Sequence, residues 1–244
     1  MVKVLVIGES CRDIFNYGEC NRLCPEAPVP IFNPSESIEN AGMAMNVQNN
    51  ISSLGVECDL ITNNNWKNIK KTRHIDQRTN HMFIRIDEND NNYGNCDLSD
   101  VDWKKYDAVV ISDYNKGFLT ESDIRTITEK HECVFMDTKR ILGSWANKVC
   151  YIKVNFSEYI NTKPFLNETL NKKLIITMGS QGSKHCDVFY PVPRVEIKDT
   201  SGAGDTFVSG LVVKYVQTGD IEQSIVFANE CATRVVQKRG VSIT

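Results

Sequence analysis

Six short runs of almost entirely apolar residues recur along the chain, and they constrain the fold more than any other feature. A strand that is apolar on both sides is buried on both faces, as in a parallel sheet covered by helices. A strand with one wet face would instead alternate apolar and polar residues. The runs therefore predict one buried parallel sheet, with strands over residues 2–8, 58–62, 107–113, 133–137, 150–155 and 174–179.

Segments with helical patterning separate these strands. Alternation of strands and helices is typical of a doubly wound α/β domain, in which the sheet is the middle of three layers. The 244 residues contain no internal repeat and no interdomain linker, so we expect residues 1–244 to form one domain. The predicted helices span residues 44–54, 121–130, 157–159 and beyond, 202–217 and 221–237.

Two segments depart from this rhythm. Residues 12–40 hold four prolines in short alternating runs, and residues 72–92 alternate apolar and charged side chains. Both patterns indicate antiparallel strands with one wet face, so we predict a small sheet outside the main one that acts as a lid. Such a sheet cannot easily bury an apolar face alone, which predicts a homodimer paired through the lid. The apolar residues assigned to that face are Ile31, Phe32, Phe83 and Ile86.

Composition excludes several classes of function. The net charge of −3 gives no electrostatic footprint for nucleic acid. No apolar run reaches the roughly 18 residues that a membrane span needs, and the first ten residues are too short for a signal peptide. The nine cysteines show no metal-binding spacing, which is typical of free thiols in a reducing compartment. We therefore expect a cytoplasmic protein without membrane or nucleic-acid partners.

The heptapeptide DTSGAGD, residues 199–205, lies at the start of a predicted helix. A helix N-terminus carries unpaired N–H groups and the positive end of the dipole, and glycines at 202 and 204 let the backbone approach an anion closely. A carboxylate there would repel phosphate, but it makes sense if a hydroxyl must lose its proton beside that phosphate. An ordinary Asp–Gly helix cap is the other interpretation, and the heptapeptide alone leaves both open.

Several motifs in the same order resemble those of the ribokinase (PfkB) carbohydrate kinases. DTSGAGD matches the family's D-T-x-G-A-G-D, TMGSQG resembles its T-x-G-x-x-G, NFSE its N-x-x-E, and NAGMAMNV the glycine-rich stretch beside the sugar. The segment GESCRDIFNYGECNRLCPEAPVPIF is similar to the opening of the bacterial heptose-7-phosphate kinases, and KTRHIDQRTNHMFIRIDEN, SDYNKG and FANECA continue that likeness. The resemblance implies a ribokinase-like fold and a kinase that uses ATP and Mg²⁺.

The resemblance also implies a role for each matched position. Asp205 would be the catalytic base, and Gly202, Ala203 and Gly204 would present N–H groups to the γ-phosphate. Asn155 and Glu158 would hold Mg²⁺ through water, although their spacing alone favours a helix cap. The nucleotide would contact Thr177, Gly179, Gly182, Asp199, Thr200 and Asn229, and the sugar would contact Asp13, Gly42 and Asn46.

A substrate that already carries a phosphate needs cations at its far end. The positions that match the heptose-phosphate kinases are Arg22, Arg85, Lys116 and Lys139. Any one of them taken alone reads as an ordinary surface charge. The run KKTR, residues 70–73, reads as a solvated face rather than a binding patch.

Some positions depart from the family pattern. Met43 replaces the family's second glycine beside the sugar, and Cys24 replaces a serine. About two dozen residues that usually precede KTR are absent, and we expect no fused nucleotidyltransferase domain. The alternatives are a kinase for another sugar or nucleoside, or a non-catalytic regulator that kept the fold.

Overall fold

An eight-stranded sheet forms the centre of the computed structural model, which describes residues 2–240. Its order is β12-β11-β10-β9-β8-β7-β1-β4, and the strands from β4 to β10 are parallel. The strands are β1 Lys3–Gly8, β4 Glu57–Ile61, β7 Ala108–Asp113, β8 Val134–Thr138, β9 Tyr151–Asn155, β10 Leu174–Thr177, β11 Ser183–His185 and β12 Val188–Tyr190. The six strands read from the apolar runs are confirmed.

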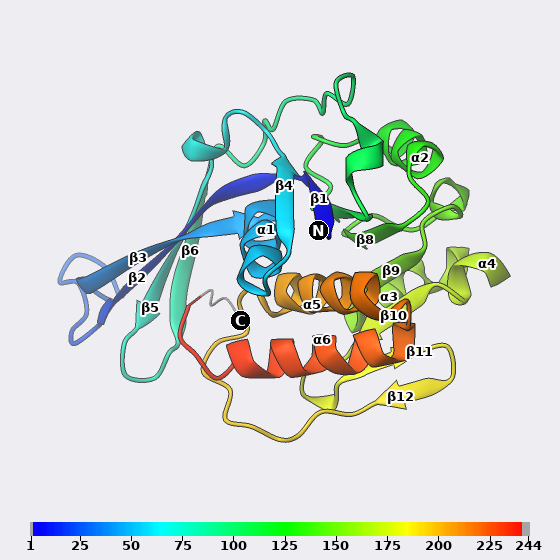
Figure 1. Ribbon diagram of the computed structural model, residues 1–244. Coiled ribbons are helices and arrows are strands. Elements are labelled where there is room, and N and C mark those ends of the chain that lie inside the picture. The colour runs from blue at the N-terminus through cyan, green and yellow to red at the C-terminus, as the bar shows by residue number, and fades with distance from the viewer. Residues whose placement is uncertain (1, 241–244) are drawn as a thin grey trace.

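Helices cover both faces of this sheet, which confirms the three-layer α/β arrangement (Figure 1). One apolar layer joins Val4, Val6 and Val110 to α1, α5 and α6, and the other joins Leu5, Ile7 and Ile111 to α2. Alternate residues of one strand thus enter opposite layers. The helices are α1 Ala44–Ser53, α2 Glu121–Lys130, α3 Phe156–Thr162, α4 Glu168–Asn171, α5 Ala203–Thr218 and α6 Ile221–Val235.

The last two strands of the sheet do not follow from the sequence pattern. β11 and β12 have three residues each, pair antiparallel, and extend the sheet beyond β10. Gly182 makes the turn into β11 with a φ of 102°, and a Cβ there would lie 2.2 Å from the carbonyl oxygen of Tyr190. Such short, half-exposed strands carry too few residues for a recognisable period.

A second, four-stranded sheet projects from the main body, as the lid prediction requires (Figure 1). Its order is β3-β2-β5-β6, and the strands pair antiparallel except β2 and β5, which are parallel, so the expectation of antiparallel strands is wrong for that pair. Residues 20–32 add only an isolated bridge between Leu23 and Pro30 rather than regular strands. The lid strands are β2 Ser10–Glu19, β3 Asn33–Met43, β5 Lys70–Asp76 and β6 Met82–Glu88.

The lid grows directly out of the main sheet. A single residue, Glu9, separates β1 from β2, and β3 runs straight into α1 at Met43. The root of the lid therefore lies at the carboxyl ends of the parallel strands, the edge at which open α/β sheets bind ligands.

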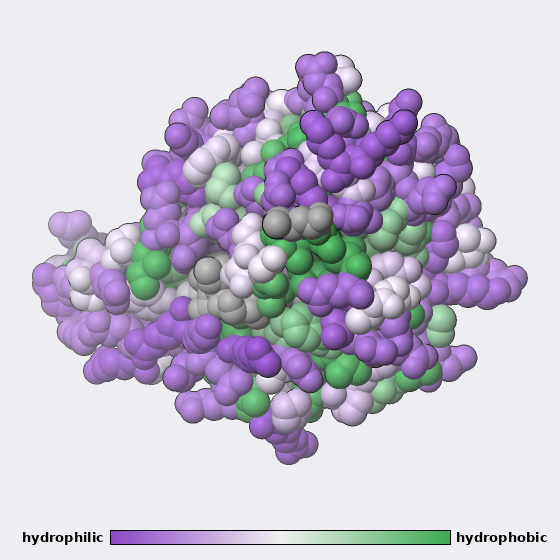
Figure 2. All heavy atoms as spheres, viewed as in Figure 1, coloured by the Kyte–Doolittle hydropathy of each residue, from purple (hydrophilic) through white to green (hydrophobic). Residues whose placement is uncertain are grey.

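The described part of the chain has no helix long and apolar enough to cross a membrane. The surface in Figure 2 is largely hydrophilic, and its hydrophobic residues gather in patches. All nine cysteines are free, as the sequence predicts.

Candidate active site

Two cavities adjoin at the amino end of α5. One, of about 290 Å³, lies under the lid and is lined by Ser201, Gly202 and Asp205 among others. The other, of about 570 Å³, lies between the β10–β11 region and α6 and includes Ala203 and Gly204 in its lining. The turn that the sequence singles out therefore forms the boundary between the two cavities.

The geometry of this turn depends on glycine. Gly202 precedes α5 with a φ of 76°, in the left-handed region that glycine adopts without strain. A Cβ on Gly204 would lie 2.8 Å from the Nζ atom of Lys153, so a side chain there would displace this ammonium group. Asp199 stabilises the turn, since its carboxylate accepts hydrogen bonds from the backbone N–H groups of Ser201 and Gly240. Asp199 lines neither cavity, although the sequence places it among the nucleotide contacts.

Asp205 lies in the first turn of α5 and is only 7% exposed. The Nδ2 of Asn46 donates to its Oδ2 at 2.8 Å, and the hydroxyl of Tyr114 donates to its Oδ1 at 2.9 Å. Burial nevertheless raises the pKa of Asp205 to about 6, and the nearby charge of Asp137 adds to this effect. A helix N-terminus favours the carboxylate, but here the loss of hydration outweighs that effect.

The residues that hold Asp205 are themselves fixed. The Nδ2 group of Asn50 donates hydrogen bonds to the backbone carbonyl oxygen of Asn46 and to its Oδ1. Tyr114 lies in the loop after β7, where its backbone N–H donates to the carboxylate of Glu9 at 2.8 Å. Glu9 also accepts from the backbone N–H of Lys116, and burial raises the pKa of the Glu9 carboxyl. The root of the lid and the loop after β7 are thereby joined beside Asp205. Sequence reasoning missed Glu9 and Tyr114.

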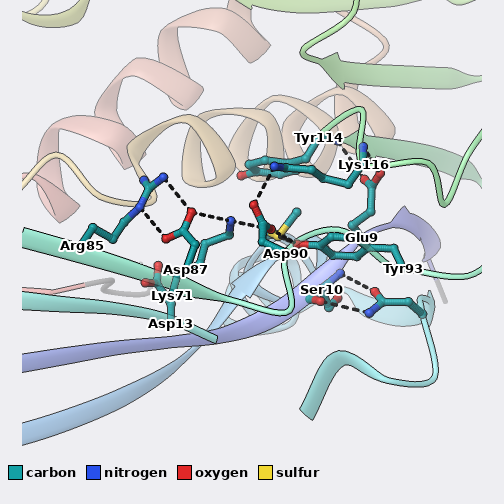
Figure 3. A network of polar contacts seen from close by, with 12 residues as sticks. Glu9, Ser10, Asp13, Lys71, Arg85, Asp87, Asp90, Tyr93, Tyr114 and Lys116 are labelled. Carbon is teal, nitrogen blue, oxygen red and sulfur yellow. Dashed lines mark hydrogen bonds and ion pairs between the residues drawn. The ribbon is translucent and has the colours of Figure 1, made fainter. Parts of the chain in front are cut away.

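The cavity under the lid is rich in paired charges (Figure 3). Asp13, expected to contact the sugar, lines it and pairs with Arg73 through two hydrogen bonds of 3.1 Å. Gly42 lines it as well, where a Cβ would lie 2.7 Å from the Sγ of Cys11. Its lining includes three carboxylates and five cations, and the latter are Lys71, Arg73, Arg85, Lys116 and Lys139.

Asp90 is the hub of these charges. Its carboxylate accepts hydrogen bonds from Lys71 at 2.8 Å, from Lys116 at 2.6 Å and from the hydroxyl of Tyr93. Burial opposes ionisation, but these donors, Lys116 foremost, lower the pKa of Asp90 to about 2. Asp87 continues the chain of charges, since it lies 3.6 Å from Lys71 and accepts two hydrogen bonds from Arg85.

The interpretation of residues 70–73 as a solvated face is wrong at two positions. Lys71 is 9% exposed, and the side chain of Arg73 is 15% exposed and pairs with Asp13. Both residues lie on the inner face of β5, which the lid turns toward the cavity.

The four predicted phosphate-reading cations do not all lie at one place. Arg85 and Lys116 line the cavity beside Asp87 and Asp90. Lys139 lines it at another point, where it pairs with Glu158 and lies 3.8 Å from Asp137. Arg22 is exposed in the loop between β2 and β3 and does not line the cavity, so within this chain the structure does not bring it to the site.

Met43, which replaces the family's second glycine, has a strained backbone conformation. Its φ is 62°, in the left-handed region that side chains rarely adopt, and the residue is 5% exposed. It lines the cavity, and the hydroxyl of Tyr93 lies 3.8 Å from its sulfur. Met43 thus contributes apolar surface beside Asp90, where a glycine would leave space.

The second cavity contains most of the predicted nucleotide contacts. Thr177 ends β10, and Gly179 and Gly182 turn the chain with positive φ values. Thr200 lies just before the turn of Gly202, Ala203 and Gly204, which is called the cradle below. Asn229 on α6 is 7% exposed and donates to the carbonyl of Tyr190 at 3.0 Å. The lining that sequence reasoning missed is mainly apolar, and includes Val192, Val195, Ile197, Phe207 and Val236.

Asn155 and Glu158 form a capping box at the start of α3, as their spacing favours. The side chain of each accepts a hydrogen bond from the backbone N–H of the other. The remaining carboxylate oxygen of Glu158 pairs with Lys139. Among the described residues, no group of three or more His, Cys, Asp or Glu side chains could hold a metal directly. One carboxylate and one amide fit an ion that keeps its waters and is bound mainly by nucleotide phosphates.

The ordered motifs and the two-cavity geometry agree with a comparison against family models. Residues 44–244 match the pfkB family of carbohydrate kinases. This chain belongs to the PfkB family.

Two curated relatives of this chain carry the same name. A Helicobacter pylori protein named bifunctional protein HldE is 28% identical over 298 residues, covering 100% of this chain and 64% of the relative. A protein of the same name from Nitratiruptor is 27% identical over 291 residues, covering 98% of this chain and 62% of the relative. The chain thus spans less than two thirds of the length of these PfkB relatives.

Solved structures confirm the ribokinase-like fold. Ribokinase from Thermotoga maritima has a TM-score of 0.74 at 15% identity, covering 99% of this chain and 95% of that one. Ribokinase from Arabidopsis thaliana, solved with ribose and ATP, has a TM-score of 0.74 at 15% identity, covering 98% and 94%. At these identities the likeness to other PfkB structures establishes the fold.

Replacing Asp205 by asparagine should stabilise the protein, with the amide oxygen accepting from Asn46 and the hydroxyl of Tyr114 turning to accept from the new NH2 group. The shift of its pKa from 3.8 to about 6 corresponds to a penalty of roughly 3 kcal/mol for the buried carboxylate, so we expect a gain of about 1–3 kcal/mol at pH 7. An acid whose pKa is higher in the folded state binds its proton more tightly when folded. The penalty is therefore present above about pH 6 and disappears as the pH falls toward the unfolded value.

Urea unfolding of wild type and Asp205→Asn between pH 4 and pH 7 measures this difference, with the exposed Asp100→Asn as the matched control. The gain should shrink toward pH 4. A variant that is less stable than wild type at pH 7, or a gain that is independent of pH, would contradict the burial argument.

Proposed function

We propose that this chain transfers the γ-phosphoryl group of ATP to a hydroxyl of a sugar phosphate, with a heptose 7-phosphate as the best candidate. The observation that carries the proposal is Asp205, a buried carboxylate at the boundary between a charged cavity and a mainly apolar one. The described residues would work as one kinase domain whose lid closes over the sugar. Membership of a carbohydrate-kinase family and the likeness to HldE support this choice.

The two cavities divide the substrates. The sugar would lie in the smaller cavity, against Asp13, Gly42 and Asn46, with its reacting hydroxyl toward Asp205. The nucleotide would lie along Thr177, Gly179, Gly182 and Asn229, with its terminal phosphate at the cradle. The cradle of Gly202, Ala203 and Gly204 presents the amino end of α5 to that phosphate, where backbone N–H groups and the helix dipole favour negative charge.

Asp205 would accept the proton of the sugar hydroxyl. With a pKa of about 6 it is mostly ionised at pH 7, yet it is a stronger base than an exposed aspartate. The hydrogen bonds from Asn46 and Tyr114 fix both of its oxygens, so the carboxylate does not have to reorient as the proton moves. Most of the remaining rate enhancement in such a site comes from positioning and charge neutralisation.

A hydrated Mg²⁺ bound to the nucleotide would neutralise phosphate charge when present. Asn155 and Glu158 are the residues that would hold its waters, from the start of α3. Lys139 already pairs with Glu158, so this lysine would lie between the metal side and the sugar side of the site.

The surplus of cations under the lid favours a substrate that carries its own phosphate. Lys116 and Arg85 are held by Asp90 and Asp87, which keeps their charged ends in place before a ligand arrives. Lys71 lies between the two carboxylates and adds a third cation. A phosphate dianion offers these donors more acceptor atoms than the carboxylates alone.

Two alternatives differ in what they require of the site. A kinase for an unphosphorylated sugar or a nucleoside would need Asp205 but not the cations under the lid. A non-catalytic regulator would need neither, and a buried carboxylate with a raised pKa would only destabilise it. The retained base argues against the regulator. The strain at Met43 and the short β4–β5 connection are the features that favour it.

Asp205→Asn should lower the turnover number by at least about a hundredfold, the lower range for removal of a general base, while ATP still binds. In the wild type, kcat/KM should fall tenfold per pH unit below about pH 6, because protonation removes the base. Coupled measurement of ADP release gives both values. Near-normal turnover of the variant would sink the assignment of the base.

Lys116→Ala should raise KM for a heptose 7-phosphate by about tenfold or more, the effect of losing one charge-assisted hydrogen bond of roughly 1.5–3 kcal/mol. Activity on the unphosphorylated heptose should barely change. The exposed Lys172→Ala, a lysine outside the site, is the control and should leave both values as in wild type. Equal effects on both substrates would show that Lys116 does not read the phosphate.

We also propose that the chain is a cytoplasmic homodimer that pairs through the outer face of the lid. Met82, Ile84 and Ile86 of β6 are between 45% and 54% exposed, and Val29 is 51% exposed beside them. These residues belong with Phe32 and Phe83, whose rings lie 6.1 Å apart, in an apolar patch around a groove of about 600 Å³. A second lid packed against this patch would bury it, and the nine free thiols suit a reducing compartment.

Light scattering at high micromolar concentration should give twice the mass of one chain. Ile84→Arg should give a monomer, because it places a charge at the centre of the patch. Ile160→Arg, which changes an equally exposed isoleucine on α3, should remain dimeric. A monomeric wild type refutes the pairing.

A further inference from the structure

A lysine interrupts one of the most apolar strands of the protein. Lys153 lies in β9 between Ile152 and Val154, which are fully or almost fully buried, and is itself only 4% exposed. It lines neither of the two cavities. A lysine with this degree of burial is rare unless it is paired and serves a purpose.

The ammonium group of Lys153 ends beneath the cradle. Its Nζ donates to Oδ2 of Asp137 at 2.8 Å, and it lies 2.8 Å from the position that a Cβ on Gly204 would occupy. The absence of a side chain at Gly204 is therefore what lets a positive charge approach the first turn of α5. Asp137 holds the ammonium there from the end of the neighbouring strand β8.

This ion pair is a poor choice for stability. Both partners are more than nine-tenths buried, and burying two charges costs free energy that their attraction often fails to recover. The second oxygen of Asp137, Oδ1, is buried without a hydrogen-bond partner among the described residues, and the Nζ atom of Lys139 is 3.8 Å from it. A pair of apolar residues would pack this position at lower cost, so its charges call for a functional explanation.

We propose that the buried ammonium of Lys153 supplies a fixed positive charge to the phosphoryl group that crosses the cradle. The inference rests on the proposed phosphoryl transfer, and it makes Lys153 a positioning residue that acts through the Gly202–Gly204 turn. A charge shielded from water acts over several ångströms more strongly than an exposed one, and it adds to the dipole of α5. Lys153 should therefore attract the γ-phosphate more strongly than the more distant phosphates of the nucleotide.

The same charge acts on the base. Lys153 lowers the pKa of Asp205, whereas burial and the negative charge of Asp137 raise it. Asn46 and Tyr114 also face Asp205 and donate hydrogen bonds to it, and the positive charge of Lys139 acts on it from the same cavity. Removal of Lys153 alone should thus weaken phosphate binding and also make Asp205 harder to ionise, a combination that a packing role would not produce.

The first test compares nucleotides that differ in the γ-phosphate. Calorimetric titration of the full chain with a non-hydrolysable ATP analogue and with ADP gives two dissociation constants. Lys153→Met keeps the length of the side chain without its charge, and should weaken binding of the ATP analogue about tenfold or more, as a buried charged interaction implies. ADP affinity should change less than about threefold, since its phosphates lie farther from the cradle. Lys173→Met, which removes a lysine that donates to the backbone carbonyls of Asn147 and Val149, is the control and should leave both constants unchanged.

The second test guards against a folding defect, because Lys153→Met leaves Asp137 buried without its main partner. The double variant Lys153→Met/Asp137→Asn removes both charges. It should still favour the ATP analogue over ADP less than wild type does, because Lys153 lies closer to the first turn of α5, at 2.8 Å from the Cβ position of Gly204, than Asp137 does at 3.9 Å. Its pH–rate profile should nevertheless fall below about pH 6 as in wild type, because the two charges act on the pKa of Asp205 in opposite directions. The single variant should show this fall at higher pH. Circular dichroism checks that each variant is folded.

The outcomes separate this inference from the proposed function. If wild type binds neither nucleotide, both are overturned. If wild type binds ATP and phosphorylates a sugar, but the double variant retains the wild-type ratio of the two affinities, only the role of Lys153 is overturned.

Discussion

The burial of one carboxylate at the amino end of α5 is the constraint on which the rest of the site depends. Asp205 can lie there because the glycines before it give the chain a left-handed turn and a close approach to β9. Its raised pKa is a direct consequence of lost hydration, which the donors Asn46 and Tyr114 offset only in part. The fold thus holds a group that is unfavourable for stability but well suited to take a proton near neutral pH.

Charged side chains couple the lid to the main sheet beside Asp205, in addition to the apolar core that Cys11 and Met43 of the lid share with the sheet. Glu9 is the single residue between β1 and β2. Its carboxylate accepts hydrogen bonds from the backbone N–H groups of Tyr114 and Lys116, in the loop after β7. Asp90 then joins that loop to β5 through Lys116 and Lys71. A change at the lid can therefore reach Asp205 through Tyr114, and the site is organised before a ligand binds. Such preorganisation reduces the ordering that binding would otherwise require.

The sequence predicted the layers of the fold well because fully buried strands carry an unambiguous pattern. It located the lid from alternation and prolines, and it located the glycine turn because few arrangements need two glycines beside an aspartate. It could not predict Asp90 as a hub or the burial of Lys71, since both depend on which residues of β5, β6 and the loop after β7 come together in space. It could not show that the pKa of Asp205 is raised, because a helix N-terminus is visible in a sequence and the burial of one side chain is not. The sequence shows that Lys153 lies in an apolar strand, but only the structure shows that its ammonium group lies next to Gly204.

We propose that the boundary between the two cavities is where a phosphoryl group passes from ATP to a phosphorylated sugar. The most direct measurement is kcat/KM from ADP release with a heptose 7-phosphate and with the same heptose lacking its phosphate. Two charge-assisted contacts of roughly 1.5–3 kcal/mol each predict a preference of at least about a hundredfold for the phosphorylated sugar. Equal rates with the two sugars would contradict the assignment of the cations under the lid, and no ADP release with any sugar or sugar phosphate would contradict the claim itself.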